Sequence, residues 1–279
     1  MGAWAQSREL TKQSWAVLRG NAYLLAYPLL GAVVCIVPLA IMVPGIFFIA
    51  SDRNWIGWAI VIVGLYLAQW ITAIFQAGLV VSAAREMEGG SSSLGHGLGT
   101  AFGRLGRLGR WAFVNTVVTV LISLLRGNNG DSVVTAIFRT VLAAAAGVMW
   151  ELITFFVMPA MMLDDLGMID AIKKSASTFK QRWGTQLSGG VRIGGLIGLL
   201  AILPAVILLV GGLFLTMAGA WAAGIPLAIV GAVVLIIASL VLSAVRGVFS
   251  VALYRYATQG VAEGGFTEQQ LAGAVRVKT

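Results

Sequence analysis

The chain has 279 residues, of which 59% are hydrophobic and 11% charged, and its mean hydropathy is +0.92. Soluble proteins carry roughly 25% charged residues, and in water this composition would expose large apolar patches, so a soluble fold is excluded. The formal net charge is +8, and the single cysteine, Cys35, excludes an intramolecular disulfide.

Six long apolar stretches occupy most of the chain, with short polar segments between them. A membrane helix needs about 20 apolar residues at about 1.5 Å each, and a lipid bilayer admits only helices and closed barrels. The stretches are too long for barrel strands, so the sequence predicts an all-α membrane protein with about six transmembrane helices arranged as three hairpins. In chain order they cover residues 23–50, 55–84, 111–125, 132–163, 191–217 and 224–256.

Each hairpin is expected to follow a basic amphipathic helix at the membrane interface, within one integral membrane domain over residues 1–279. In the third of these units, Ile172, Ala176, Phe179 and Trp183 recur at helical spacing, which predicts an apolar stripe. The expected segments are an interfacial helix 1–22, hairpin 1 at 23–84, a cytoplasmic amphipathic segment 85–110, hairpin 2 at 111–163, a cytoplasmic amphipathic helix 164–186, hairpin 3 at 187–257 and a cytoplasmic tail 258–279.

The basic residues sort by side in this topology. Of the 19 Lys and Arg residues, all but Arg53, Arg126 and Arg139 fall on the side that holds both termini. Short loops rich in Lys and Arg stay in the cytoplasm. We therefore expect a multi-pass protein of the cell inner (plasma) membrane with both termini cytoplasmic.

Two of the six stretches have unsuitable lengths. Residues 111–125 would span about 22 Å as a helix and residues 132–163 about 48 Å, against a hydrocarbon core of about 30 Å. We expect the fourth stretch to begin with a helix at the outer interface that keeps Arg139 in water, with the crossing starting near Ala143. A re-entrant third segment is the alternative.

Small residues and prolines predict how the helices pack. Gly190, Gly194 and Gly198 form one ridge of small residues, and Ala220, Gly224, Ala228 and Ala232 form another, which favours close approach of two helix backbones. Prolines kink or break helices, which we expect at Pro28, Pro38, Pro44, Pro159 and Pro204.

A short motif joins the fourth apolar stretch to the third amphipathic segment. It resembles the motif of a broad group of uncharacterised prokaryotic six-helix membrane proteins, similar to the membrane domain found ahead of some glycerophosphodiester phosphodiesterases. The resemblance implies the six-helix fold over nearly the whole chain, but no hydrolase activity and no catalytic residue. The motif comprises Phe155-Phe156-Val157-Met158-Pro159-Ala160, Asp164-Asp165-Leu166-Gly167, Asp170-Ala171-Ile172-Lys173-Lys174-Ser175 and Arg182-Trp183-Gly184.

Glu151 is the only acid inside an apolar stretch, and we expect it near the membrane midplane. Charges at that depth are costly and often mark functional sites. Polar stripes on other helices supply candidate partners, which would either line a polar cavity or form interhelical hydrogen bonds worth about 0.6 kcal/mol each. The candidate intramembrane polar site comprises Glu151, Gln69, Gln76, Asn115, Ser243 and Arg246.

The amphipathic segments are expected to meet the headgroups of anionic lipids, where each basic residue contributes about 1 kcal/mol. The alternative is that they only anchor the hairpins. The candidate lipid contacts are Arg104, Arg107, Arg110, Lys173, Lys174, Lys180 and Arg182.

Other chemistry is not indicated. His96 is the only histidine, and no acid cluster lies inside the apolar stretches, so neither a metal site nor a cofactor site is expected. Residues 103–110 are basic but lack the aromatic side chains of a nucleic-acid platform. Asp164 and Asp165 are expected to complement the dipole of the helix that follows them.

Two functional hypotheses follow. The first is a non-enzymatic inner-membrane protein that acts as a scaffold, an accessory subunit or a lipid-contacting module. Its partners would be the anionic headgroups of membrane lipids, and a protein partner or a second copy of the chain is possible. The alternative is a small-solute transporter or channel that uses Glu151 and the polar stripes.

Overall fold

The computed structural model describes residues 13–49, 54–125, 133–183, 195–268 and 271, and all regular secondary structure in these ranges is helical. The predicted all-α class is therefore confirmed. Residues 13–20 form a helix ahead of the first numbered element. The elements are the 3-10 helix η1 (Ala22–Leu25) and the α-helices α2 (Ala26–Ile49), α3 (Asn54–Met87), α4 (Leu94–Phe102), α5 (Leu105–Leu125), α6 (Val133–Thr154), α7 (Val157–Leu163), α8 (Met168–Trp183), α9 (Gly195–Met217) and α10 (Trp221–Gln259).

Several of these helices have the dimensions of membrane spans, which indicates a membrane protein. Five helical stretches in the described ranges are long and apolar enough to cross a bilayer, and a shorter apolar stretch, Ile202–Met217, belongs to α9. The count of six crossings and the orientation of the chain stay predictions. The five longer stretches are Ala22–Ile49, Asn54–Met87, Leu105–Leu125, Val134–Leu163 and Trp221–Gln259.

The third apolar stretch is longer than the sequence indicated. Helix α5 begins at Leu105, ahead of the expected Trp111, and its 21 residues span about 31 Å. It is one uninterrupted helix and not a re-entrant segment. Glycine disfavours helix, but Leu108, Gly109 and Trp111 are buried against the bundle, so packing sustains the helix through this glycine-rich segment.

The fourth apolar stretch is interrupted close to Pro159, where the proline predicted a kink or a break, and not near Ala143. Helix α6 runs through Ala143 without a break and ends at Thr154, and α7 begins at Val157 after a turn at Phe155 and Phe156. The expected interruption near Ala143 is therefore wrong. Pro159 explains the position of the break, because it has no N–H to donate and its ring would clash with the carbonyl four residues earlier.

A serine from α8 satisfies the backbone groups that the break sets free. The buried N–H of Phe156 donates to Oγ of Ser175 at 3.1 Å, and the Ser175 hydroxyl donates to the carbonyl of Ile153 at 2.5 Å. Ser175 is fully buried. The break and the docking of α8 thus depend on one another.

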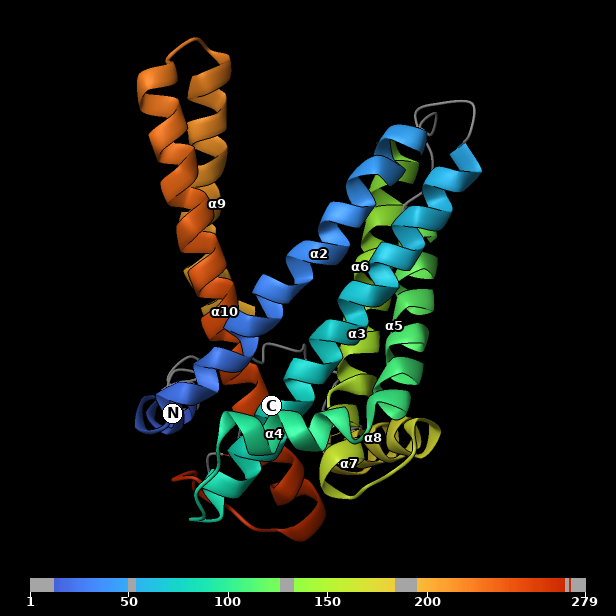
Figure 1. Ribbon diagram of the computed structural model, residues 1–279, viewed down its shortest axis with the longest axis vertical. Helices are drawn as coiled ribbons and strands as arrows, with labels where there is room; N and C mark the ends of the chain where they lie inside the picture. The colour runs from blue at the N-terminus through green and yellow to red at the C-terminus, as the bar shows by residue number, and fades with distance from the viewer. Residues whose placement is uncertain (1–12, 50–53, 126–132, 184–194, 269–270, 272–279) are drawn as a thin grey trace.

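The helices form a V-shaped assembly that is closed at one end (Figure 1). Helix α3 is central, since it packs against α2, α4, α5, α7 and α10. At the closed end α4, α7 and α8 gather around η1 and the C-terminal part of α10, and we call this end the basal layer. The large buried side chains of the described residues concentrate there, including Tyr27, Phe156, Met161 and Tyr254.

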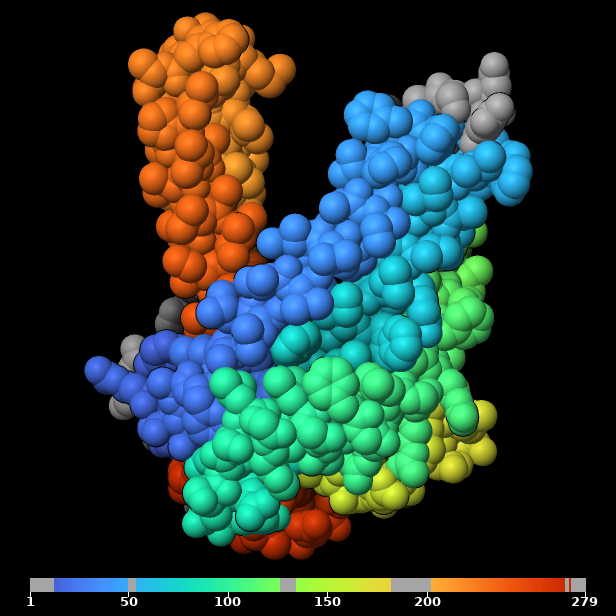
Figure 2. All heavy atoms as spheres, in the orientation of Figure 1, coloured from blue at the N-terminus to red at the C-terminus, as the bar shows by residue number. Residues whose placement is uncertain are grey.

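The α9–α10 hairpin forms the other arm of the V, and its outer half stands apart from α2 (Figure 2). Its two helices pack closely against one another. A Cβ atom at Gly212 would collide with the backbone of Ala228, and one at Gly224 would collide with Thr216. The close approach expected at Gly224 and Ala228 is therefore confirmed, with Gly212 on the facing helix. Gly190 and Gly194 lie outside the described residues.

Replacing Ser175 by alanine tests the link between the break and α8. Ser175→Ala leaves a buried N–H and a buried carbonyl without this partner, and each unsatisfied group costs about 1–3 kcal/mol. We expect a lower unfolding temperature in detergent. Ser177→Ala is the matched control, because Ser177 is exposed and bonds only within its own helix. Equal unfolding temperatures for the two variants would contradict this account.

Candidate functional site

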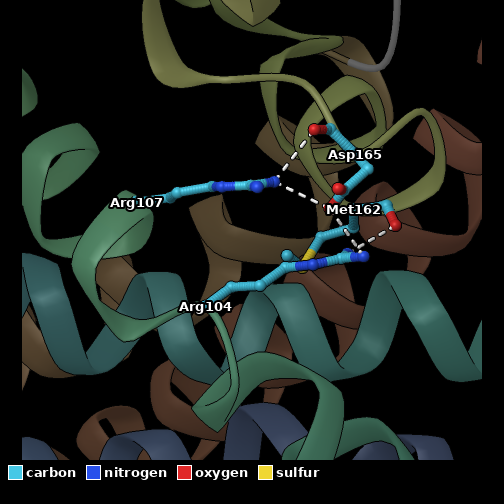
Figure 3. A network of polar contacts seen from close by, with 4 residues as sticks. All are labelled: Arg104, Arg107, Met162 and Asp165. Atoms are coloured by element: carbon cyan, nitrogen blue, oxygen red, sulfur yellow. Dashed lines mark hydrogen bonds and ion pairs between the residues drawn. The ribbon is translucent and has the colours of Figure 1, made fainter.

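Arg104, in the α4–α5 turn, and Arg107, in the first turn of α5, hold the loop between α7 and α8 (Figure 3). Arg104 and Arg107 both reach Oδ1 of Asp165, at 2.9 and 2.7 Å. Arg104 also donates to the carbonyl of Met162 at 2.7 Å, and Arg107 to the carbonyl of Asp165 at 2.9 Å. Both cations, expected as lipid contacts, are therefore engaged within the protein.

The two aspartates of this loop bind neighbouring elements. Asp165 has a left-handed backbone, with φ of 54°, and its hydrogen bond from Arg107 and the nearby charge of Arg104 lower the pKa of its carboxyl. Asp164 accepts a hydrogen bond from the Tyr254 hydroxyl of α10 at 2.5 Å. Both residues thus tie the α7–α8 loop to α5 and α10, and the role expected for them, complementing the dipole of α8, stays a prediction.

Helix α8 is amphipathic, as predicted, but its buried face is centred elsewhere. Ala171, Ser175 and Thr178 are buried, and Ile172 and Phe179 flank them as partly buried contacts of the core. The predicted stripe is therefore rotated by about one residue, or about 100°. The side chain of Trp183 lies outside the described residues.

The remaining candidate lipid contacts are exposed. Lys173, Lys174 and Lys180 lie on the outward face of α8, and Arg110 is exposed on α5. Within the described ranges none of these four forms an ion pair. The side chain of Arg182 lies outside those ranges. The basal layer thus presents a set of cations that are available to an external anion.

Four of the six candidate intramembrane residues form two pairs, and the other two stand apart. Glu151 of α6 lies 3.6 Å from Arg246 of α10, and about two thirds of each side chain is exposed in the protein alone. Glu151 is three residues from the end of α6, about 4.5 Å along the helix axis. Within the longer apolar stretch Val134–Leu163, however, Glu151 is the eighteenth of 30 residues, so its expected position near the membrane midplane stays a prediction.

Gln69 and Asn115, together with Trp150, link α3, α5 and α6. Asn115 donates to the side chain of Gln69 at 3.1 Å and accepts a hydrogen bond from the indole of Trp150 at 2.8 Å. Trp150 also stacks on Trp111, with ring centroids 6.0 Å apart. The sequence offered Gln69 and Asn115 as candidates for either a polar cavity or interhelical hydrogen bonds, but it did not indicate Trp150, which looks like an ordinary apolar residue.

Gln76 and Ser243 do not join either group. Gln76 is exposed on α3 and Ser243 is half-buried on α10. Neither forms a hydrogen bond with the other four candidates among the described residues. The geometry therefore favours interhelical hydrogen bonding over a shared polar cavity for this set.

A second polar network in the basal layer was not expected from the sequence. Arg255 of α10 is nearly buried and pairs with both Glu88 and Glu263. The Tyr27 hydroxyl lies 2.6 Å from the hydroxyl of Ser82. In the sequence, the only indication of this network is Ser82, which interrupts a run of small and apolar residues near the end of α3.

The fold and these contacts define an all-helical membrane bundle whose elements are tied together by polar contacts in one layer. A family described as "Family of unknown function (DUF6159)" matches residues 55–265, more than half of the chain, and the chain belongs to that family. No curated protein and no solved structure matches the chain. The function of this family is unknown. The comparison does not link the chain to phosphodiesterase membrane domains.

Acid titration tests the loop contact. Because the folded pKa of Asp165 is lowered, its pairing stabilises the fold above the ordinary carboxyl value of 3.8 and is lost as the pH falls through the folded pKa. We expect the Asp165→Asn variant to unfold at a lower temperature than the wild type at pH 7. The difference should disappear once the pH has fallen below the lowered pKa of Asp165 in the folded protein. Glu268→Gln, at an exposed carboxylate, is the control. A constant difference across the titration would contradict the assignment.

Proposed function

We propose that this is a non-enzymatic membrane protein that binds anionic lipid headgroups at its basal layer. The observation that carries the proposal is the geometry of α8. One face of the helix is fixed in the bundle by Ser175, and the opposite face presents Lys173, Lys174 and Lys180. A docked helix holds these charges in place without further ordering when a lipid binds.

The electrostatics favour this use of the basal layer. Basic residues near an anionic leaflet each contribute about 1 kcal/mol of attraction. Arg104 and Arg107 share the single carboxylate of Asp165, whereas the α8 lysines are exposed. In this proposal the positive-inside rule places the basal layer and both termini on the cytoplasmic side of the inner membrane.

The absence of enzymatic activity is part of the proposal. The imidazole of His96 lies on the exposed helix α4 with its Nε2 atom 3.2 Å from Arg85. It is therefore not arranged as a base for a serine nucleophile.

A scaffold or accessory role would use the lateral surface. Phe47 of α2, Met217 of α9 and Trp221 of α10 are among the large apolar side chains left exposed in the outer arms of the V. Lipid chains cover such side chains in a membrane. A protein partner or a second copy of the chain would bind here in the proposed scaffold role.

The lipid proposal is tested by replacing Lys173, Lys174 and Lys180 together with glutamine. In bilayers that contain spin-labelled phosphatidylglycerol or phosphatidylcholine, we expect the wild type to prefer the anionic lipid. The glutamine variant should lose that preference, by up to about a hundredfold, because three lysines contribute about 1 kcal/mol each. The measurement is the relative lipid association constant by electron spin resonance.

The matched control replaces the same three lysines with arginine, which retains the charge. This variant should keep the preference for phosphatidylglycerol. The proposal is wrong if the glutamine and arginine variants select lipids equally well.

Transport is the second candidate, and the Glu151–Arg246 pair is the observation that favours it, because two charged groups meet between α6 and α10. Solute flux in proteoliposomes that Glu151→Gln abolishes, with the unfolding temperature unchanged, would support transport. A lower unfolding temperature without any flux would assign the pair to helix packing.

A further inference from the structure

A continuous groove runs along the contact between α3 and α5. It consists of two cavities, of about 570 and about 400 Å³, that share the side chains of Tyr66 and Phe113. Both are open depressions of the surface rather than enclosed cavities. The remaining wall residues are Trp70, Leu105, Gly106, Gly109, Arg110, Val114 and Met168 in the first cavity, and Ile62, Val63, Thr116, Val117, Val120 and Leu121 in the second.

The groove opens on the lateral surface of the bundle. Phe113 and Leu121 are more than half exposed, and so is Val63 on the facing helix. In a membrane this surface faces lipid chains.

The polarity of the groove changes from one end to the other. Its outer cavity is apolar, because the Thr116 hydroxyl is bonded to the carbonyl of Ala112 at 2.8 Å and the Tyr66 hydroxyl lies beside Gly109 at the basal end. At the basal end the Trp70 indole donates to the carbonyl of Leu105 at 3.3 Å. Arg110 is exposed there and forms no ion pair with any described residue. The groove thus joins an apolar wall to one available cation.

The length of the groove matches one leaflet. From Arg110 to Leu121 the axis of α5 rises about 17 Å, which is roughly half of the hydrocarbon core of about 30 Å. The cation at one end and the apolar wall along this distance match the headgroup and one acyl chain of a phospholipid.

We propose that the α3–α5 groove is a specific site for one anionic phospholipid, with an acyl chain along Tyr66 and Phe113 and the phosphate beside Arg110. This inference rests on the proposed function, since it names one bound lipid of the same class. The site differs from the α8 lysines in that it would contact an acyl chain and not only a headgroup.

Two glycines make room for the chain. A Cβ atom at Gly106 would meet open space, whereas one at Gly109 would lie 3.4 Å from the ring of Trp70 and from the Tyr66 hydroxyl. A large side chain at position 106 would therefore enter the groove without displacing the backbone. This makes Gly106→Phe a variant that blocks the site while leaving the fold intact.

The experiment uses the full-length protein in bilayers that contain phosphatidylglycerol with a diazirine in its acyl chain. After illumination, adducts are mapped by mass spectrometry and compared with those from the matched phosphatidylcholine. We expect adducts concentrated on Tyr66, Phe113 and Val114, with a preference for phosphatidylglycerol. Gly106→Phe should remove them, and Gly99→Phe, at an exposed glycine of α4 that also faces open space, should not.

The headgroup is tested at Arg110. Arg110→Gln should lower the preference for phosphatidylglycerol about fivefold, the ratio that one interfacial charge supplies, and Arg110→Lys should retain it. The inference is overturned if adducts spread evenly over α2, α5 and α9, if Gly106→Phe leaves them unchanged, or if a second copy of the chain is cross-linked in the groove.

Failure of this inference is distinguishable from failure of the proposed function. The glutamine variant of the three α8 lysines should lower overall selection of anionic lipid and leave the groove adducts in place. Gly106→Phe should do the reverse. Groove adducts that disappear in the lysine variant would show that there is no separate site.

Discussion

The structure depends on how the backbone N–H and carbonyl groups that lose their helical partners at the end of α6 find other hydrogen-bond partners. Apolar helices gain little by leaving apolar lipid for one another, so polar contacts and close packing must hold a membrane bundle together. Pro159 ends the helix inside a buried layer, and Ser175 accepts and donates the two hydrogen bonds that the break requires. The remaining contacts of the basal layer follow from the position that this gives to α8.

With α8 fixed in this way, the charges of the basal layer divide into two groups. Arg104 and Arg107 face inward to Asp165 and close the α7–α8 loop against α5. The lysines of α8 face outward. The outer arms of the V have few polar contacts and expose apolar side chains, so the molecule is held at its base and open laterally. Such an arrangement suits a protein that selects lipids in one leaflet.

The sequence predicted those features that depend on local pattern. Run length predicted the long helices, the proline rule predicted an interruption in the fourth stretch, and the spacing of α8 predicted its outward lysines. Contacts over long separations were not predictable, because Asp165 and Arg107 are 58 residues apart and Asp164 and Tyr254 are 90 apart. The start of α5 at Leu105 was missed because burial outweighs the low helix propensity of its glycines. The α3–α5 groove has no sequence signal, since only the helix contact brings Tyr66 and Phe113 together.

The central claim is that the basal layer lies on one face of a membrane that the long helices cross. It is tested most directly by labelling single cysteines with a membrane-impermeant thiol reagent in oriented vesicles, in a Cys35→Ser background. Ser177→Cys on α8 and His96→Cys on α4 should react from the same side, and Trp55→Cys, at the other end of α3, should react from the opposite side. Reaction of the α8 and α4 positions from opposite sides would contradict the account.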